Sequence, residues 1–170
     1  MTDSTTLPQG DLGLLDTPTA QELLQSRIPA RLAYLATDGT PRVIPTWFHW
    51  TGTEVVMATY IAGPRAGIHQ PASRVAALRA HPAVALIVDT ETFPPKVLTI
   101  RGAAEVTEVA GLAPEYVAAA RRYLGPGADA MLAQMDQEGT AQARIAVRPS
   151  WAGLIDFVTR LPAVQGGVQG

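Results

Sequence analysis

Residues 41–50, PRVIPTWFHW, have the pattern of a β-strand that is interrupted by a proline. The segment follows Asp38-Gly39, a dipeptide typical of tight hairpin turns, and its residues alternate well enough for pairing. Pro45 lies in the middle and has no N–H to donate to a neighbouring strand. A proline of this kind is normally confined to a sheet edge, a bulge or the start of a strand. The segment therefore predicts a strand with a sheet edge, a bulge or a strand start at Pro45.

Two further strands flank this segment. Residues 30–37 (ARLAYLAT) precede the Asp38-Gly39 turn, and residues 54–60 (EVVMATY) follow a second turn at 51–53. Strands joined by turns this short usually pair with their neighbours in sequence. We therefore expect the three strands to form a meander.

The rest of the chain predicts three more strands and small helices. A helix over 73–82 follows a Gly/Pro-rich loop, and two helices over 114–125 and 128–139 precede the last strand. The strands are expected at 83–90, an apolar run that indicates burial on both faces, at 96–108, with a bulge or bend at Gly102, and at 141–151. The pattern predicts an α+β fold built on a six-stranded antiparallel barrel, since closure removes exposed edges.

Length and composition limit the kind of protein that this chain can be. Its 170 residues fit one domain, which we expect over 17–162, between a flexible N-terminal arm (1–16) and a disordered tail (163–170). A net charge of −2 argues against nucleic acid or an anionic membrane as partner. The chain has no cysteine, no signal-peptide pattern and no apolar run near the ~20 residues of a membrane span, which together predict a cytoplasmic protein.

The common catalytic patterns are absent from the sequence. The three histidines, His49, His69 and His81, have no partner at metal-ligand spacing, so we expect no metal site. Neither a cysteine nucleophile nor a G-x-S-x-G elbow is present. We therefore predict no catalytic side chain.

Basic residues at the ends of predicted elements are what remains. Ser73 and Arg74 open the helix after the loop, where free N–H groups and the helix dipole favour a phosphate. The alternative is that Ser73 only caps the helix and that Arg74 is solvated. These residues taken alone leave both readings open.

The order of the motifs resembles the pyridoxamine 5′-phosphate oxidase-like family. Three segments carry the resemblance, which covers roughly residues 20–160: RLAYLATDGTPRVIPTWFHWTGTEVVMAT, SRVAALRAHPAVALIVD and KVLTIRGAAEV. Members are split β-barrel proteins that bind FMN or the deazaflavin F420, usually as homodimers. The resemblance implies a split barrel with small flanking helices and a flavin-dependent oxidoreductase that acts on a small organic substrate. FMN is the expected cofactor and F420 the alternative. A flavin-binding carrier or sensor without turnover, and a barrel that has lost its ligand, are further alternatives.

The resemblance also implies which residues bind the cofactor. The main chain of the second strand would lie along the ring system and ribityl chain, at Val43, Ile44, Pro45, Thr46 and Trp47. The phosphate would be held by Arg42, Ala58, Thr59, Ser73 and Arg74, with Arg65 as a second phosphate arginine in the F420-binding branch. Lys96 would contact the pyrimidine edge. Trp151 would stack near the flavin, often across the dimer interface, or would be a plain core or interface tryptophan.

Two departures from the family pattern concern the reaction. Trp47 stands where true pyridoxamine phosphate oxidases have a lysine, and Arg160-Leu161-Pro162 replaces the R-L-H-x-R signature near the C-terminus. We therefore expect a relative that uses the same platform for another substrate. The cofactor would carry the redox chemistry, and the protein would supply binding and orientation.

Overall fold

The computed structural model describes residues 7–64, 66 and 71–161. Their strands form one antiparallel sheet in the order β2-β1-β5-β6-β7-β4-β3. The strands are Ala30–Leu35 (β1), Pro41–Thr46 (β2), His49–Trp50 (β3), Val55–Ala62 (β4), Ala83–Asp89 (β5), Val97–Ala110 (β6) and Ala141–Ile155 (β7). The helices are Leu12–Asp16 (η1), Pro18–Leu24 (α1), Pro71–Ala80 (α2), Pro114–Leu124 (α3), Gly125–Gly127 (η2) and Ala128–Met135 (α4).

The sheet is forced to curl by a short link between its two edges. β2 and β3 are the two edge strands of the described sheet, yet only Trp47 and Phe48 separate them in sequence. Successive Cα atoms are 3.8 Å apart, so the ends of β2 and β3 lie within about 11 Å of each other. The sheet must therefore bend until its edges face each other.

The α+β class and the antiparallel sheet are confirmed, whereas the strand count and the meander need correction. The hairpin at Asp38-Gly39 pairs β1 with β2 as predicted, and Gly39 has the positive φ of +79° that such a turn requires. The expected second strand breaks at Trp47, so its two halves join opposite edges and β2 does not pair with β4. The described residues thus form seven strands in a sheet that is not closed, rather than a closed six-stranded barrel.

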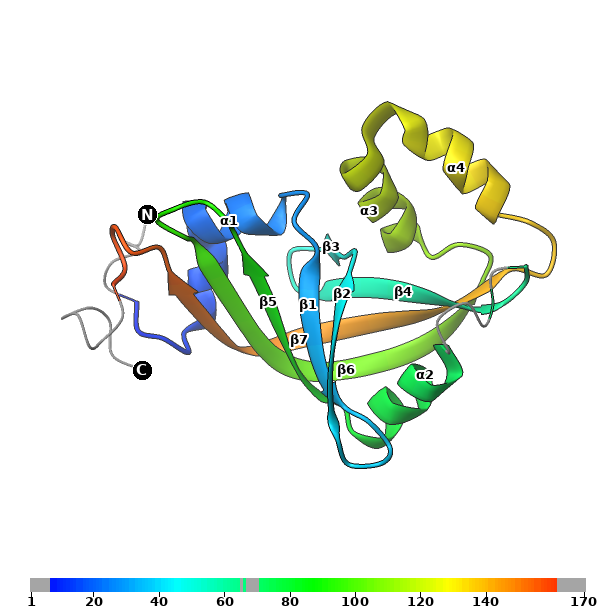
Figure 1. Cartoon of the computed structure of the whole chain (residues 1–170), viewed down its shortest axis with the longest axis horizontal. Helices are drawn as coiled ribbons and strands as arrows, with labels where there is room; N and C mark the ends of the chain where they lie inside the picture. Colours follow the sequence, from blue (N-terminus) through cyan, green and yellow to red (C-terminus); the bar gives the residue numbers. More distant parts are fainter. Residues whose placement is uncertain (1–6, 65, 67–70, 162–170) are drawn as a thin grey trace.

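Most of the core lies on the inner face of the curled sheet. β5 contributes Val84, Leu86 and Val88, each at most 7% exposed, while Ile87 on its other face is 38% exposed. The prediction that this strand is buried on both faces is therefore wrong for the single chain. Figure 1 shows the long strands β6 and β7 crossing the molecule, with α1 near one end and α2 and the α3–α4 pair on either side of the other. Within the described residues, no helix has the length and apolarity that a membrane span requires.

The first described residues are packed against the sheet. Gln9 exchanges two hydrogen bonds of 2.8 Å with the backbone of Leu154, and Leu14 and Leu15 in η1 are buried in the core. Helix α1 then begins after Thr17, whose hydroxyl accepts a hydrogen bond from the N–H of Ala20. The packed structure therefore starts before residue 17, and residues 7–16 of the expected arm belong to it.

Gly102 lies where β6 and β7 change register, as the sequence predicted. β7 has one more residue than β6 at this point, because Arg101 pairs with Trp151 and Gly102 pairs with Pro149. A Cβ on Gly102 would lie only 2.1 Å from the carbonyl oxygen of Arg148. The two backbones approach so closely that no larger residue fits.

Replacing this glycine is expected to destabilise the protein. Gly102→Ala should lower the free energy of unfolding by about 2 kcal/mol or more, because the clash is with main chain that cannot rotate away. Gly127→Ala is the matched control, since a Cβ there would meet no atom within 4 Å and φ is −81°. It should be neutral or stabilising by up to about 1 kcal/mol. Equal urea midpoints for the two variants would contradict this account.

Candidate functional site

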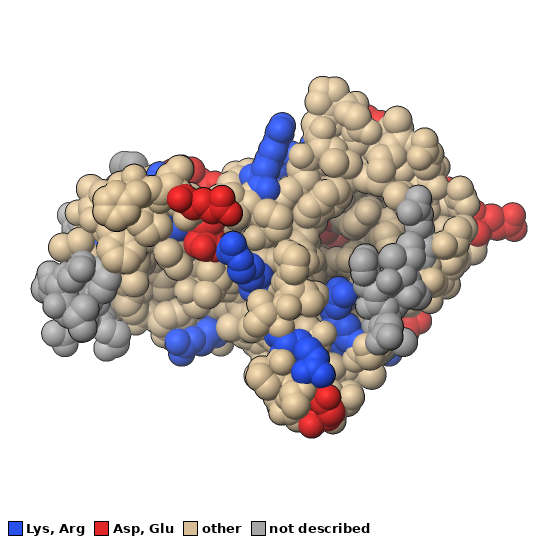
Figure 2. Space-filling model, in the orientation of Figure 1, with Lys and Arg blue, Asp and Glu red and all other residues tan. Residues whose placement is uncertain are grey.

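A pocket of about 790 Å³ opens between β2, β4, α2 and α3. The surface is hollowed between the α3–α4 pair and the part of the molecule that holds α2, and basic side chains lie along the lower margin of the hollow (Figure 2). The described lining residues are Tyr34, Arg42, Ile44, Pro45, Thr46, Trp47, Ala58, Thr59, Tyr60, Ser73, Arg74 and Tyr116. The lining thus combines arginine and hydroxyl groups with four aromatic rings.

The two arginines of the pocket differ in their partners. Arg42 forms an ion pair of 3.0 Å with Asp38 and also donates to the hydroxyl of Thr40. Arg74 is half-buried, its Nε is buried, and that atom has no hydrogen-bond partner among the described residues. No ion pair of the described chain includes Arg74 either. Its charge is therefore available to a ligand.

Three of the four aromatic residues of the pocket are held by contacts with other rings. The ring of Trp47 stacks on Tyr123 with centroids 5.0 Å apart and planes 6° apart. Tyr60 and Tyr116 meet edge to face at 5.7 Å. Tyr123 in turn donates a 3.1 Å hydrogen bond to the carbonyl of Ile28. These contacts fix flat surfaces of the kind that stack on a planar ligand.

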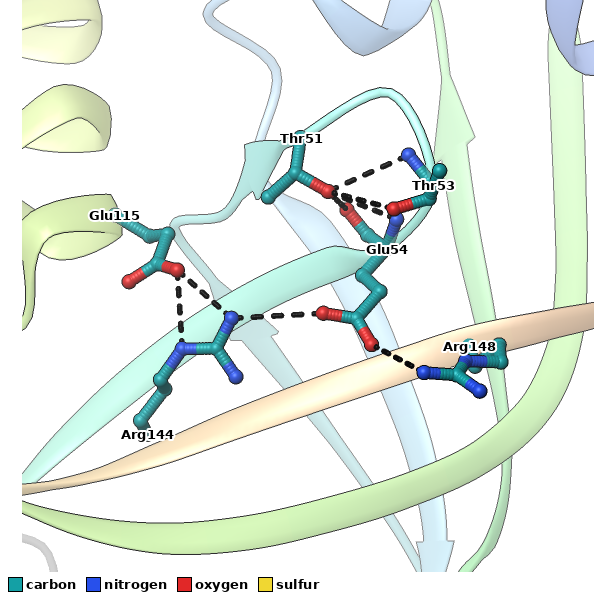
Figure 3. Close-up of polar contacts among 6 residues, drawn as sticks. All are labelled: Thr51, Thr53, Glu54, Glu115, Arg144 and Arg148. Atoms are coloured by element: carbon teal, nitrogen blue, oxygen red, sulfur yellow. Dashed lines mark hydrogen bonds and ion pairs between the residues drawn. The ribbon is translucent and has the colours of Figure 1, made fainter.

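Helix α3 is tied to the sheet by an ion pair next to the pocket. Arg144 of β7 donates two hydrogen bonds, of 2.8 and 3.0 Å, to Oε1 of Glu115, and also lies 3.5 Å from Glu54 (Figure 3). The hydrogen bonds from Arg144 lower the pKa of Glu115, and the same contact raises the pKa of Arg144. Both groups are therefore charged at neutral pH.

The pocket brings together most of the residues that the family resemblance assigned to cofactor binding. Nine of them line it: Arg42, Ile44, Pro45, Thr46, Trp47, Ala58, Thr59, Ser73 and Arg74. Their role in binding stays a prediction.

Three of the other four assigned residues, Val43, Lys96 and Trp151, are not among the described residues that line the pocket. Val43 lies on the opposite face of β2 and is 64% exposed. Lys96 forms a 2.6 Å ion pair with Glu22. Trp151 makes a cation–π contact, in which the guanidinium carbon of Arg101 lies 4.1 Å from the centroid of its ring. Arg65 lies outside the described residues.

Three tyrosines of the pocket were not predicted. Tyr34 pairs directly with Arg42 across the hairpin, so counting back from the Asp38-Gly39 turn could have found it. Tyr60 is two residues beyond Ala58 and shares its face by strand alternation. Tyr116 reaches the pocket only because α3 packs over β4, and no local pattern reveals that contact.

Comparison with solved structures identifies proteins of the same architecture. A protein named F420 reductase has a TM-score of 0.57 and 28% sequence identity, covering 78% of this chain and 94% of its own. A putative pyridoxamine 5′-phosphate oxidase from Listeria innocua has a TM-score of 0.53 and 14% identity, covering 80% of this chain and 94% of its own. HutZ, a heme storage protein from Vibrio cholerae, has a TM-score of 0.54 and 18% identity, covering 82% and 92%. No protein-family model and no curated protein matches the sequence significantly.

These neighbours confirm the resemblance that the sequence showed. They include pyridoxamine phosphate oxidase-like and F420 reductase structures, which are split-barrel proteins of the pyridoxamine 5′-phosphate oxidase-like family. The curled antiparallel sheet with small helices at its ends is the architecture that the resemblance implied.

His49, beside the Arg144 network, predicts a pH dependence of stability. Burial lowers its pKa from 6.5, the charge of Arg122 lowers it further, and Glu115 acts in the opposite direction. The unfolded chain therefore binds this proton more readily than the folded one. The free energy of unfolding should be highest above pH 6.5 and should fall as the pH drops below that value. His49→Gln should flatten this part of the curve, measured by urea denaturation, and an unchanged curve would refute the assignment.

Proposed function

We propose that this protein is an oxidoreductase that binds a phosphorylated flavin or deazaflavin in the pocket between β2, β4, α2 and α3. The observation that carries the proposal is the guanidinium of Arg74, which has a buried Nε and no hydrogen-bond or ion-pair partner among the described residues. Burying a charge without a partner is costly, so such a group implies a ligand of opposite charge. A phosphate matches it, since guanidinium binds phosphate through two parallel hydrogen bonds.

The neighbouring residues suit the same phosphate. Ser73 lies beside Arg74 in the first turn of α2, where backbone N–H groups and the helix dipole favour an anion. Thr59 adds a hydroxyl from β4. Arg42 stands at the rim with its charge already shared with Asp38, so we assign it a secondary role.

The remaining part of the pocket suits a planar ring. β2 pairs only with β1 among the described strands, so the backbone on its other side is available to a ligand. Trp47, Tyr60 and Tyr116 provide fixed aromatic surfaces nearby. A flavin or deazaflavin bound there would supply hydride chemistry at its ring, while the protein would bind and orient it.

The cofactor is proposed to be F420, with FMN as the alternative. The sequence favoured FMN, whose compact phosphate needs only one clamp. A protein named F420 reductase is 28% identical over 94% of its length, and this similarity favours F420 over FMN as the proposed cofactor.

Replacing Arg74 tests the phosphate clamp. Arg74→Met should weaken binding of F420 or FMN about ten- to a hundredfold, the loss expected for one charge-assisted contact of about 1.5–3 kcal/mol. Arg79→Met is the matched control, since Arg79 lies on the same helix but pairs with Glu108 at 3.0 Å outside the pocket. Fluorescence titration of both cofactors measures the effect. Equal affinities of the two variants would overturn the assignment.

Turnover distinguishes an oxidoreductase from a carrier or sensor. If the protein is an oxidoreductase, protein-bound reduced cofactor should lose its electrons to an added acceptor faster than free cofactor does. A carrier or sensor would bind the cofactor without this acceleration. Stopped-flow absorbance at the cofactor's visible band, with a panel of acceptors, separates the two.

A homodimer is also proposed, and an exposed apolar sheet face supports it. Pairing places Val43, Ala33 and Ala85 in one row across β2, β1 and β5, on the face that turns away from the core. The same row continues through Arg101 to Trp151. Val43 and Ile87 are 64% and 38% exposed on this face. A sheet face that leaves apolar side chains open to water beside charged ones is a common protein contact surface, and a second copy offers an identical face.

Charge on this face should separate the two copies. Val43→Lys is expected to convert a dimer into a monomer, because lysine on the face would have to be buried without a partner. Leu12→Lys is the control, since Leu12 is 43% exposed but lies on η1 and outside this row of strand residues. Light scattering coupled to size exclusion gives the mass. A monomeric wild-type protein, or a Val43→Lys variant that stays dimeric, would contradict the proposal.

A further inference from the structure

Arg144 in the middle of β7 connects two parts of the structure that are far apart in sequence. Its guanidinium contacts Glu115 in the first turn of α3 and Glu54 in the turn between β3 and β4. All three side chains are mostly buried, with 24%, 17% and 20% of their surface exposed. Removing one partner of an ion pair that is shielded from water costs far more free energy than removing one partner of an exposed pair.

The Glu54 end of the bridge is fixed by its own turn. The hydroxyl of Thr51 accepts hydrogen bonds from the N–H groups of Glu54 and Thr53, at 3.0 and 3.3 Å (Figure 3). The N–H of Thr51 returns a 3.0 Å bond to the carbonyl of Glu54. Arg148 also contacts Glu54, at 3.3 Å, but its side chain is 78% exposed and it does not reach α3. The turn therefore fixes Glu54, and Glu54 holds the Arg144 side chain on the side of the sheet.

The Glu115 end of the bridge sets the start of α3. Glu115 and Tyr116 are consecutive, and a helix turns by about 100° per residue, so their side chains point in different directions. Glu115 points to Arg144, and Tyr116 points into the pocket. β7 makes a second contact here, since the N–H of Ala113 donates a 2.8 Å bond to the side-chain oxygen of Gln142.

The α3–α4 pair depends on such contacts because its apolar packing is separate from the main core. Ala120, Ala128 and Leu132 form a small cluster of their own, against which Trp47 and Tyr116 pack. This cluster is distinct from the large cluster inside the sheet. The fully buried part of this interface is small and alanine-rich, so directional polar bonds to the sheet add to the ring and side-chain packing that orients the helix.

We propose that Arg144 is the positioning residue for the aromatic side of the pocket, and that its bond to Glu115 sets the affinity of the pocket for a planar ring. Arg144 is not among the described residues that line the pocket. It fixes the first turn of α3, and through that turn it holds the ring of Tyr116 at 5.7 Å from Tyr60. This role rests on the proposed function, in which a ring occupies the pocket. The phosphate end, on α2, is independent of Arg144.

The experiment separates ring binding from phosphate binding. Each ring is titrated with and without its phosphate group: FMN against riboflavin, and F420 against its deazariboflavin core, which lacks the phosphate together with the tail attached to it. Arg144→Met should weaken both members of a pair by the same factor, about five- to tenfold, as expected for loss of one coupled contact. The ratio of the affinity for the phosphorylated compound to the affinity for the unphosphorylated one should not change. Arg74→Met should instead reduce that ratio, because it removes the phosphate contact alone.

Matched variants control for damage to the fold. Arg148→Met removes a contact to the same Glu54 without touching α3, and it should change no affinity. Arg144→Lys keeps the charge and should recover part of the loss. Arg144→Met with Glu115→Gln leaves no unpaired carboxylate on α3, and it should bind as Arg144→Met does if the bond between the two residues is what matters.

The outcomes are distinct. The positioning role is overturned if Arg144→Met leaves both ring affinities unchanged, if it lowers the ratio within a pair, or if Arg148→Met has the same effect. If the wild-type protein binds none of the four compounds, the proposed function fails, and the positioning role fails with it.

Discussion

The link of two residues between β2 and β3 is the constraint on which the rest of the structure depends. Trp47 and Phe48 join strands that lie at opposite edges of the sheet, so the sheet has to curl around its core. Because the edges face each other without pairing, a gap is left beside β2, and the pocket opens there. Phe48 closes the inner side of the link as a fully buried residue, while Trp47 faces the pocket and stacks on α3. One short segment therefore determines both the fold and the position of the site.

Charge distribution gives this gap its chemical character. Several arginines elsewhere in the described chain face carboxylates, as Arg31 does with Asp89 and Arg79 with Glu108. Arg74 is directed into the pocket without such a partner, which leaves the site cationic at the α2 end. The α3 end of the pocket is different. Its charged side chains neutralise one another in the Arg144 network, and the surface that lines the pocket there is aromatic. A ligand with an anionic group at one end and a flat ring at the other matches both ends.

The sequence predicted much of this arrangement, and the failures have physical reasons. Alternation and turn residues placed the strands, and Gly102 marked the register change, because these are local properties. The partner of each strand is not local: nothing in PRVIPTWFHW shows that its two halves join opposite edges. Ile87 is as apolar as its buried neighbours, so the exposed face of β5 could not be recognised either. In the pocket, Tyr34 and Tyr60 follow from counting along strands, whereas Tyr116 and Arg144 depend on how α3 packs.

The most direct test of the account is a crystal structure of the protein with its bound cofactor, F420 or FMN. The account predicts a phosphate oxygen within hydrogen-bond distance of the Arg74 guanidinium, the ring along the free edge of β2, and Tyr116 beside it. A cofactor bound elsewhere, or a phosphate in this pocket that leaves Arg74 without a contact, would contradict the central claim that the gap beside β2 is a cofactor site.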